Sequence, residues 1–398
     1  MTFWTDLRTP VIGLSPMDGV TDSVFRFMTA TQGKPDVIFT EFTNVHDVCR
    51  GPEYLLDSLH YHEAERPIVA QLYGKDPELF YQAAHVVCEL GFDGLDINMG
   101  CPSRNVASSG SGAALIRTPD LAHAIMRAAR QGIADWTAGQ TLEAAGLKAA
   151  RVEIVNRFNA GRDPRAASSA HGAVRARSAI PLSVKTRLGY DEVIVERWIE
   201  HLLIEAPAVI SLHGRTLEQM YKGAADWAAI GRAAEVVRGS GTLLLGNGDV
   251  HSLPEVAARV RDTRVDGVLV GRAVLGAPWF FQRKEEARHA AARQEPWDPQ
   301  PSTPSLDARF EILLEHARRF ERQWGAHHFR RMRKHLGWYC KGFPHAAALR
   351  ASMFRVSSVA DVEAVLADYR AGRLIDGDQR NDSPVAEDET ASLASRCG

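Results

Sequence analysis

Residues 242–272 read TLLLGNGDVHSLPEVAARVRDTRVDGVLVGR, and this stretch carries the pattern that decides the fold. Two short apolar runs, Thr242–Leu245 and Gly267–Val270, flank Pro254–Val260, whose apolar residues recur at helical spacing. The proline stands near the first turn of this helix, where its missing N–H costs nothing. The stretch therefore predicts a strand–helix–strand unit, with parallel strands that are buried on both faces.

The same unit recurs through the first 280 residues. Apolar runs that end in polar or glycine residues lie at Pro10–Pro16, Val37–Thr40, Ile68–Leu72, Gly94–Ile97, Leu182–Val184, Val209–Leu212, Thr242–Leu245 and Gly267–Val270. Helix-like stretches such as Pro77–Leu90 and Pro119–Arg130 lie between them. Eight such units predict an α/β fold, a (β/α)8 TIM barrel. A doubly wound sheet shares this alternation, but it normally carries a Gly-rich fingerprint after its first strand, and Leu14–Gly19 is not one.

Two segments do not fit a plain barrel. Residues 131–179 are longer than ordinary βα connections, and we interpret them as an insertion with helical spacing over Ala144–Phe158. Residues 294–304 form a polar, Pro-rich linker, and the pattern after it is helical. We therefore expect the barrel over residues 1–293, a small C-terminal helical domain over 305–370, and a disordered acidic tail over 371–398.

Composition excludes several classes of protein. The chain has 398 residues, 45% of them hydrophobic, and no run approaches the roughly 18 apolar residues of a membrane span. Met1–Thr9 lacks the basic start and apolar core of a signal peptide. None of the five cysteines forms a CxxC pair, which argues against a structural zinc site. We expect a cytoplasmic protein without a membrane segment or a metal, and a monomer by default.

The net charge of −2 hides an uneven distribution. Taken over the whole chain it argues against a nucleic-acid partner. Residues 307–355, however, hold eleven Lys/Arg against four Asp/Glu, whereas residues 371–398 hold three Arg against six Asp/Glu. The expected helical domain is therefore strongly basic.

Polar residues at strand ends are the candidates for the active site, because (β/α)8 barrels place their chemistry at the C-terminal ends of the strands. These candidates are Ser15, Pro16, Met17, Asp18, Glu41, Gln71, Asn98, Cys101, Lys185, Arg187, His213, Asn247, Gly248, Asp249, Gly271 and Arg272. Each alone is compatible with an ordinary cap or turn residue. Their joint occurrence at all eight strand ends indicates one site.

Three features indicate what this site binds. The glycines after the last two strands favour a phosphorylated ligand, which Arg272 can bind, although two tight turns with an exposed arginine explain the same residues. Cys101 is placed to act as a nucleophile or proton donor. Lys185 suggests an anionic or electron-rich ligand, or alternatively a salt bridge to Glu41 or Asp96. His213 is a donor to the same ligand or a hydrogen-bonded rim residue.

Six motifs together resemble the tRNA-dihydrouridine synthases. They are Ser15–Asp22 (SPMDGVTD), Asp96–Pro102 (DINMGCP), Val184–Gly189 (VKTRLG), Leu212–Thr216 (LHGRT), Asn247–Asp249 (NGD) and Gly271–Arg272 (GR). The resemblance covers residues 8–370 in the right order. It implies an FMN-binding (β/α)8 barrel followed by a small helical domain.

The resemblance also implies roles for individual residues. FMN is held by Pro16, Met17, Asp18, Gln71, Lys185, His213, Asn247, Gly248, Asp249, Gly271 and Arg272. NADPH or NADH reduces FMN, which passes a hydride to C6 of uracil, and Cys101 donates a proton to C5. Asn98 and Arg187 line the uracil pocket.

A basic segment in the expected helical domain is the candidate for tRNA binding. His327–Tyr339 combines Arg330, Arg331, Arg333 and Lys334 with aromatic residues, a composition suited to phosphate contacts and base stacking. A basic helix face packed on the barrel has the same composition. The overlap with the family pattern favours RNA.

Two other functions remain open at the level of sequence. An FMN-barrel oxidoreductase acting on a free pyrimidine or small enone, like dihydroorotate dehydrogenase, shares the flavin residues but leaves the basic segment unused. A non-catalytic tRNA-binding protein explains the basic segment, but it has no need of Cys101 and Lys185.

Overall fold

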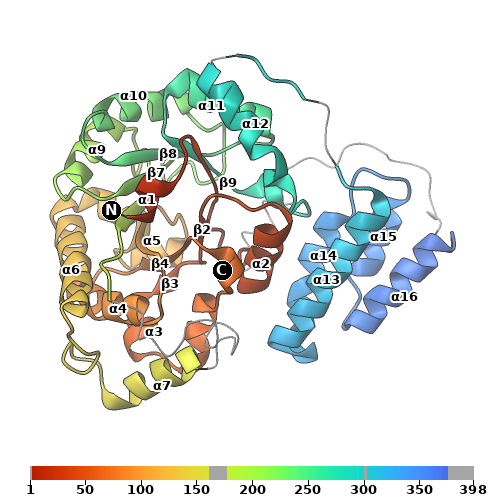
Figure 1. The fold of residues 1–398 in the computed structure, drawn as a ribbon, viewed down its shortest axis with the longest axis horizontal. Coiled ribbons are helices and arrows are strands. Elements are labelled where there is room, and N and C mark those ends of the chain that lie inside the picture. Colours follow the sequence, from red (N-terminus) through yellow and green to blue (C-terminus); the bar gives the residue numbers. More distant parts are fainter. Residues whose placement is uncertain (1, 161–176, 294, 300–302, 375–398) are drawn as a thin grey trace.

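The computed structural model describes residues 2–160, 177–293, 295–299 and 303–374 (Figure 1). Its strands are β1 Val11–Leu14, β2 Ile38–Phe39, β3 Thr43–Asn44, β4 Ile68–Tyr73, β5 Gly94–Met99, β6 Leu182–Arg187, β7 Val209–His213, β8 Leu243–Asn247 and β9 Gly267–Val270. The parallel order β2-β1-β9-β8-β7-β6-β5-β4 closes into a ring because β2 also pairs with β4. The predicted TIM barrel is confirmed.

Each of the eight predicted apolar runs overlaps one strand of the ring. The additional strand β3 pairs with β4 alongside the ring, and the apolar pattern gave no signal for its two residues. Strands β5 and β6 extend two and three residues beyond their apolar runs, because Asn98 and Lys185 pair within the sheet. The polar ends of these strands are therefore held rigidly by the barrel.

Helices cover the outside of the ring (Figure 1). They are α2 Ser23–Gln32, α3 Val45–Arg50, α4 Pro77–Glu89, α6 Pro119–Thr137, α9 Val195–Leu203, α10 Trp227–Val237, α11 Leu253–Thr263 and α12 Lys284–Arg293, whereas α1 Phe3–Asp6 and α5 Arg104–Ser108 lie over the middle of the ring in this view. Short 3-10 turns join them, among them η1 Glu53–Leu59, η2 Glu63–Glu65, η3 Gly112–Arg117, η4 Arg272–Val274 and η5 Phe280–Arg283. Side-chain caps fix several helix starts; for example, Asp76 accepts from the N–H of Glu78 at 3.0 Å.

The long interval after β5 is partly barrel and partly an added helix. Helix α6 continues to Thr137, beyond the boundary expected at residue 131, because Ile133 keeps its apolar face buried. Helix α7, Ala149–Ala160, overlaps the stretch expected to be helical, Ala144–Phe158, and lies below the barrel in Figure 1. Residues 161–176 of the expected insertion lie outside the described residues.

Helix α7 is fastened to the barrel by Arg151. Its buried guanidinium donates to three backbone carbonyls at the end of α3, those of Asp47 at 2.6 Å, Val48 at 2.6 Å and Gly51 at 2.9 Å. Arg157, on the same helix, makes an exposed ion pair with Glu53 at 2.7 Å. The added helix thus covers the outer side of α3.

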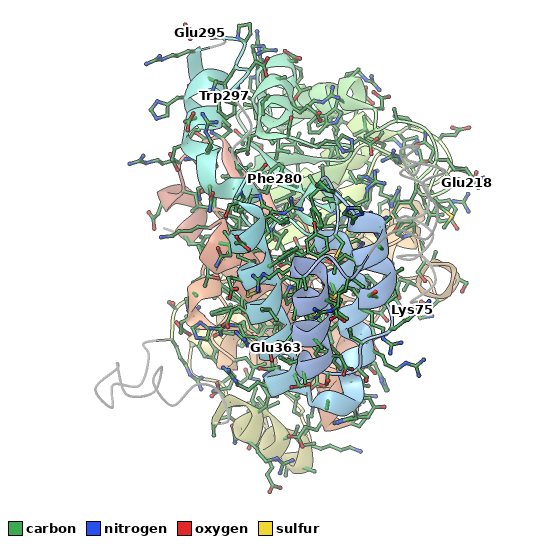
Figure 2. All side chains as sticks on the ribbon, turned by 90° about the vertical axis from the view of Figure 1, so that its right-hand side faces the viewer. Lys75, Glu218, Phe280, Glu295, Trp297 and Glu363 are labelled. Atoms are coloured by element: carbon green, nitrogen blue, oxygen red, sulfur yellow. The ribbon has the colours of Figure 1, made fainter. Side chains whose placement is uncertain are left out.

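Four helices form a second unit beside the barrel. They are α13 Leu306–Trp324, α14 Arg333–Tyr339, α15 Ala346–Met353 and α16 Val359–Arg370, and the turn η6 Ala326–Met332 precedes α14. Figure 2 views the molecule from this side, with Glu363 of α16 in front of the barrel. Their apolar core includes Val24 of α2 and Trp279, so the unit packs directly on the barrel. Of the acidic tail expected over residues 371–398, residues 375–398 lie outside the described residues.

Within the described ranges, we find no helix with the combination of length and apolar character that crossing a membrane requires.

Candidate functional site

One cavity opens at the C-terminal ends of the barrel strands. It has a volume of about 550 Å³ and is lined from every strand of the ring. Its lining includes all the strand-end residues that the sequence analysis assigned to the cofactor, the acid or the uracil: Pro16, Met17, Asp18, Gln71, Asn98, Cys101, Lys185, Arg187, His213, Asn247, Gly248, Asp249, Gly271 and Arg272. Barrel closure brings these residues together, although their positions span more than half of the chain.

A chain of hydrogen bonds runs from the barrel interior to Cys101. The Asp96 carboxylate accepts from the Gln71 amide at 2.7 Å, and Gln71 accepts from the Asn98 amide at 3.0 Å. The Asn98 oxygen then accepts the backbone N–H groups of Gly100 at 3.0 Å and Cys101 at 2.9 Å. Buried Asp96 therefore orients both amides and fixes the turn that presents the thiol.

The Cys101 thiol is kept protonated by its surroundings. The residue is only 6% exposed, and burial raises the pKa of the thiol above its ordinary value, outweighing the backbone hydrogen bond from Ser103. Arg187 and Lys185 lower the pKa by smaller amounts. At neutral pH the site therefore holds a thiol, which is the form that a proton donor needs.

Arg187 supports the same turn from β6. Its Nε donates to the carbonyl of Gly100 at 2.7 Å, and Nη1 donates to the carbonyls of Thr216 at 2.9 Å and Met220 at 3.2 Å. Desolvation lowers its pKa to about 10. The Arg187 guanidinium therefore links two loops of the cavity through hydrogen bonds, and it also lines the cavity.

The opposite wall of the cavity is basic. Asp249 pairs with Arg215 at 2.6 Å and Arg272 at 2.8 Å and so sets both guanidinium groups at the rim. Burial, together with four neighbouring cations, holds the pKa of His213 well below its usual range. His213 is therefore neutral at pH 7, with one ring nitrogen as donor and one as acceptor.

The residues of this basic wall fit FMN. Within the described residues Lys185 Nζ has no hydrogen-bond or ion-pair partner, and burial lowers its pKa to about 8. A desolvated ammonium without a partner is costly unless a ligand supplies negative charge. Gly248 has φ +124°, and a Cβ there would lie 2.8 Å from Ala225 and 3.1 Å from His213, so only glycine allows this close approach. An electron-rich ring with a phosphate would supply the negative charge that Lys185 lacks, whereas the need for glycine at position 248 comes from contacts within the protein.

Several cavity residues were missed by the strand-end argument. They are Phe42, Arg215, Met220, Tyr221, His251, Leu275 and Trp338, all of which line the cavity. Most lie in loops beyond the strand ends, where no apolar run marks their position. Trp338 comes from α14 of the helical unit, and no pattern along the chain connects it to the barrel.

The basic segment of the helical unit is divided by the structure. Arg330 and Arg331, in η6, are exposed. Arg333 donates to the carbonyls of Val356 at 2.7 Å and Arg355 at 3.1 Å, and Lys334 donates to the carbonyl of Gly19 in the barrel. Two of the four charges therefore face solvent, while the other two bind backbone.

The closed barrel, the buried thiol at its rim and the basic wall opposite define an FMN-dependent oxidoreductase of the (β/α)8 class. The model of the dihydrouridine synthase family matches residues 13–135 and 161–372 of this chain. The chain belongs to that family, and the resemblance inferred from its motifs is confirmed. The match leaves out residues 136–160, which include α7.

Individual relatives agree with the family match. A protein named probable tRNA-dihydrouridine synthase 2 from Bacillus subtilis is 32% identical over 94% of this chain and 98% of its own length. A probable tRNA-dihydrouridine synthase from Staphylococcus aureus is 30% identical over 93% of this chain and 96% of its own. Among solved structures, the old yellow enzyme homologue from Zymomonas mobilis matches 70% of this chain and 88% of its own at 11% identity, with a TM-score of 0.39.

Among the described residues, no group of three His, Cys, Asp or Glu side chains is placed to hold a metal ion.

Proposed function

We propose that this chain is a tRNA-dihydrouridine synthase, which reduces the C5=C6 bond of specific uridines in tRNA with FMN as cofactor and NADPH or NADH as reductant. The observation that carries the proposal is the placement of Cys101, a buried thiol, at the rim of a cavity with a basic wall. Membership in the dihydrouridine synthase family supports the same reaction.

The cofactor site is assigned to the basic wall. Asn247 to Asp249 and Gly271 with Arg272 would hold the phosphate, and Lys185 and His213 would lie against the ring system, with Pro16 to Asp18 and Gln71 completing the site. When bound, FMN supplies the hydride that reduces the uracil at C6. With FMN bound, Lys185 and Arg272 would stabilise the negative charge of the phosphate and of the reduced ring.

Cys101 completes the reduction by protonating C5. Addition of hydride at C6 leaves enolate character over C5 and O4, and this carbon takes the thiol proton. Asn98 keeps the turn of Cys101 fixed, and both Asn98 and Arg187 border the space left for the uracil. Nε and Nη1 of Arg187 already donate to backbone carbonyls. Arg187 therefore positions the cavity loops, and only its remaining N–H groups are available to contact the uracil.

The tRNA must present its target base outside the stack, because the reacting atoms lie inside a barrel mouth. Extrusion costs a few kcal/mol, which contacts elsewhere must supply. We assign these contacts to the helical unit, with Arg330 and Arg331 as exposed phosphate ligands, while Arg333 and Lys334 bind the backbone of the helical unit and of the barrel. A substrate of this kind implies a cytoplasmic enzyme, and a monomer suffices for the site as described.

The test is the dihydrouridine content of tRNA from a strain that lacks this gene and its homologues. Wild-type chain should restore dihydrouridine, Cys101→Ala should not, and the matched variant Cys88→Ala, at a buried cysteine on α4 outside the cavity, should restore it. If the wild type leaves tRNA unchanged, the proposal is wrong. Reduction of free uracil or orotate, with no action on tRNA, would instead indicate an FMN-barrel oxidoreductase of small pyrimidines.

A further inference from the structure

Lys334 connects the helical unit to the turn that follows the first barrel strand. Its Nζ donates to the carbonyl of Gly19. The turn is closed internally, since the N–H groups of Val20 and Thr21 donate to the carbonyl of Met17 at 3.0 and 2.9 Å. Met17 and Asp18 in this turn line the cavity. A side chain of α14 thus holds the backbone of one cavity wall.

The same helix also contacts the loop after the last barrel strand. Lys341, just beyond α14, donates from Nζ to the carbonyl of Leu275 at 3.0 Å. Gly276 has φ +69°, and a Cβ there would lie 2.0 Å from the Trp338 carbonyl oxygen, so the two backbones are in direct contact. Leu275 and Trp338 both line the cavity. Because β1 and β9 are neighbours in the barrel, α14 spans two adjacent loops of the cofactor site.

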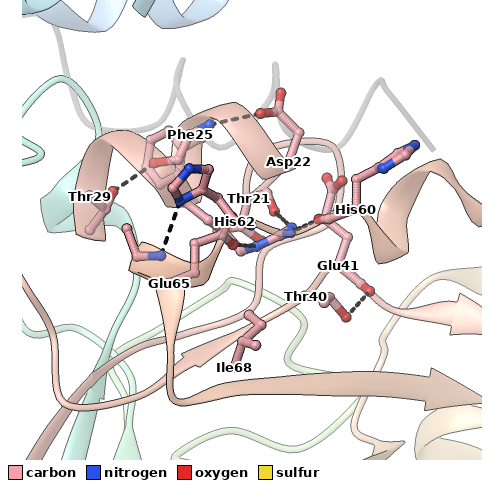
Figure 3. A network of polar contacts seen from close by, with 12 residues as sticks. Thr21, Asp22, Phe25, Thr29, Thr40, Glu41, His60, His62, Glu65 and Ile68 are labelled. Carbon is pink, nitrogen blue, oxygen red and sulfur yellow. Dashed lines mark hydrogen bonds and ion pairs between the residues drawn. The ribbon is translucent and has the colours of Figure 1, made fainter. Parts of the chain in front are cut away.

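Lys334 also faces a group of three carboxylates. Burial raises the pKa of Asp18, Asp22 and Glu41, that of Glu41 to about 8, and the charge of Lys334 acts in the opposite direction on each. Arg26 is a second cation near Asp22 and Glu41, but its guanidinium donates to Glu65 at 2.7 Å and to the carbonyls of Thr21 and His60. Figure 3 labels these three partners together with Asp22 and Glu41. Without Lys334, the carboxyl group of Asp18, which lines the cavity, would have less positive charge nearby.

We propose that Lys334 is a positioning residue of the cofactor site, which holds the turn at Met17–Val20 in the shape that FMN requires and offsets the acidic charge beside it. The helical unit then forms one wall of the flavin pocket in addition to carrying tRNA contacts. Since η6 directly precedes α14, bound tRNA and bound flavin contact one continuous segment. This inference rests on the proposed function.

The test measures FMN binding to flavin-free protein by the quenching of flavin fluorescence, with no substrate present. Lys334→Met should weaken FMN binding about tenfold, because a buried carbonyl loses a charged donor and the acidic group loses its cation. Lys334→Arg should restore affinity to within about threefold. The matched change Lys148→Met, at an exposed lysine before α7, should leave FMN affinity unchanged.

The outcomes of this experiment separate a failure of the proposed function from a failure of the inference about Lys334. If wild-type protein binds no FMN, the proposed function fails. If it binds FMN, and Lys334→Met binds equally well but loses affinity for tRNA, Lys334 is a phosphate contact and the inference is wrong. Should Lys334→Met not fold, Lys341→Met tests the same role at the second loop: a loss of FMN affinity of similar size supports α14 as a pocket wall, and unchanged affinity overturns it.

Discussion

The side-chain oxygen of Asn98 lies 2.9 Å from the backbone nitrogen of Cys101 and 3.0 Å from that of Gly100. A single amide therefore accepts two N–H groups of the turn that carries the thiol. The amide is itself held by Gln71, which is held by Asp96. Asn98, Gln71 and Asp96 are all buried, so solvent does not replace a hydrogen bond that is lost at Asn98. A substitution of Asn98 therefore shifts the turn that carries Cys101.

We expect Asn98→Ala to slow the protonation step. The turn loses its acceptor, and a displacement of about 1 Å can cost about 100-fold in rate, so single-turnover reduction of tRNA should fall by roughly 10- to 100-fold. Asn98→Asp keeps an oxygen for the two N–H groups but cannot donate to Gln71, and it should lie between wild type and alanine. Equal rates in all three proteins would contradict a positioning role.

Glu41 should make the protein less stable as pH rises. Its pKa is about 8 in the folded chain because of burial and the neighbouring Asp22 and Asp18, against 4.5 unperturbed. Between these values the unfolded state has released a proton that the folded state keeps, so this contribution to stability is full below pH 4.5 and is lost as pH approaches 8. Urea unfolding of Glu41→Gln should show a shallower decline from pH 5 to pH 8. The exposed variant Glu218→Gln should follow wild type.

Arg330 and Arg331 should contribute to tRNA affinity through phosphate contacts. Replacing either by Met should weaken binding to all tRNAs alike and reduce the slope of log K against log salt by about one. Arg318→Met is the control, since Arg318 is an exposed arginine of the same unit that is already paired with Glu363 at 2.6 Å. An unchanged slope in the Arg330 and Arg331 variants would place the tRNA on another surface.

Arg151 should be worth far more to stability than Arg157, although both belong to α7. Arg151→Met leaves one buried and two part-buried carbonyls without their donor and should cost roughly 2–4 kcal/mol of unfolding free energy in urea. Arg157→Met breaks an exposed ion pair and should cost about 0–1 kcal/mol. Similar losses for both would mean that α7 is not anchored through α3.

Much of the site follows from sequence because the barrel imposes a simple rule. A run such as Val209–Leu212 predicts a buried strand, and the residue after it, His213, must then lie at the active-site rim. The same rule places Cys101 and Lys185 without knowledge of any contact. Closure of eight parallel strands converts positions along the chain into positions around one cavity.

The remaining relationships depended on tertiary structure, because they join residues far apart in sequence that share no periodic pattern. The basic segment around Lys334 indicated nucleic acid, but a lysine that binds phosphate and one that binds the carbonyl of Gly19 have the same sequence signature. Trp338 likewise enters the cavity only because the helical unit packs on the barrel. The sequence by itself determined the barrel and the ring of strand-end residues, since these follow from local hydrophobic patterns, and it determined the family through its six motifs. The packing of the two units decided which polar side chains face the cavity and which bind other parts of the protein. No local sequence pattern encodes this packing.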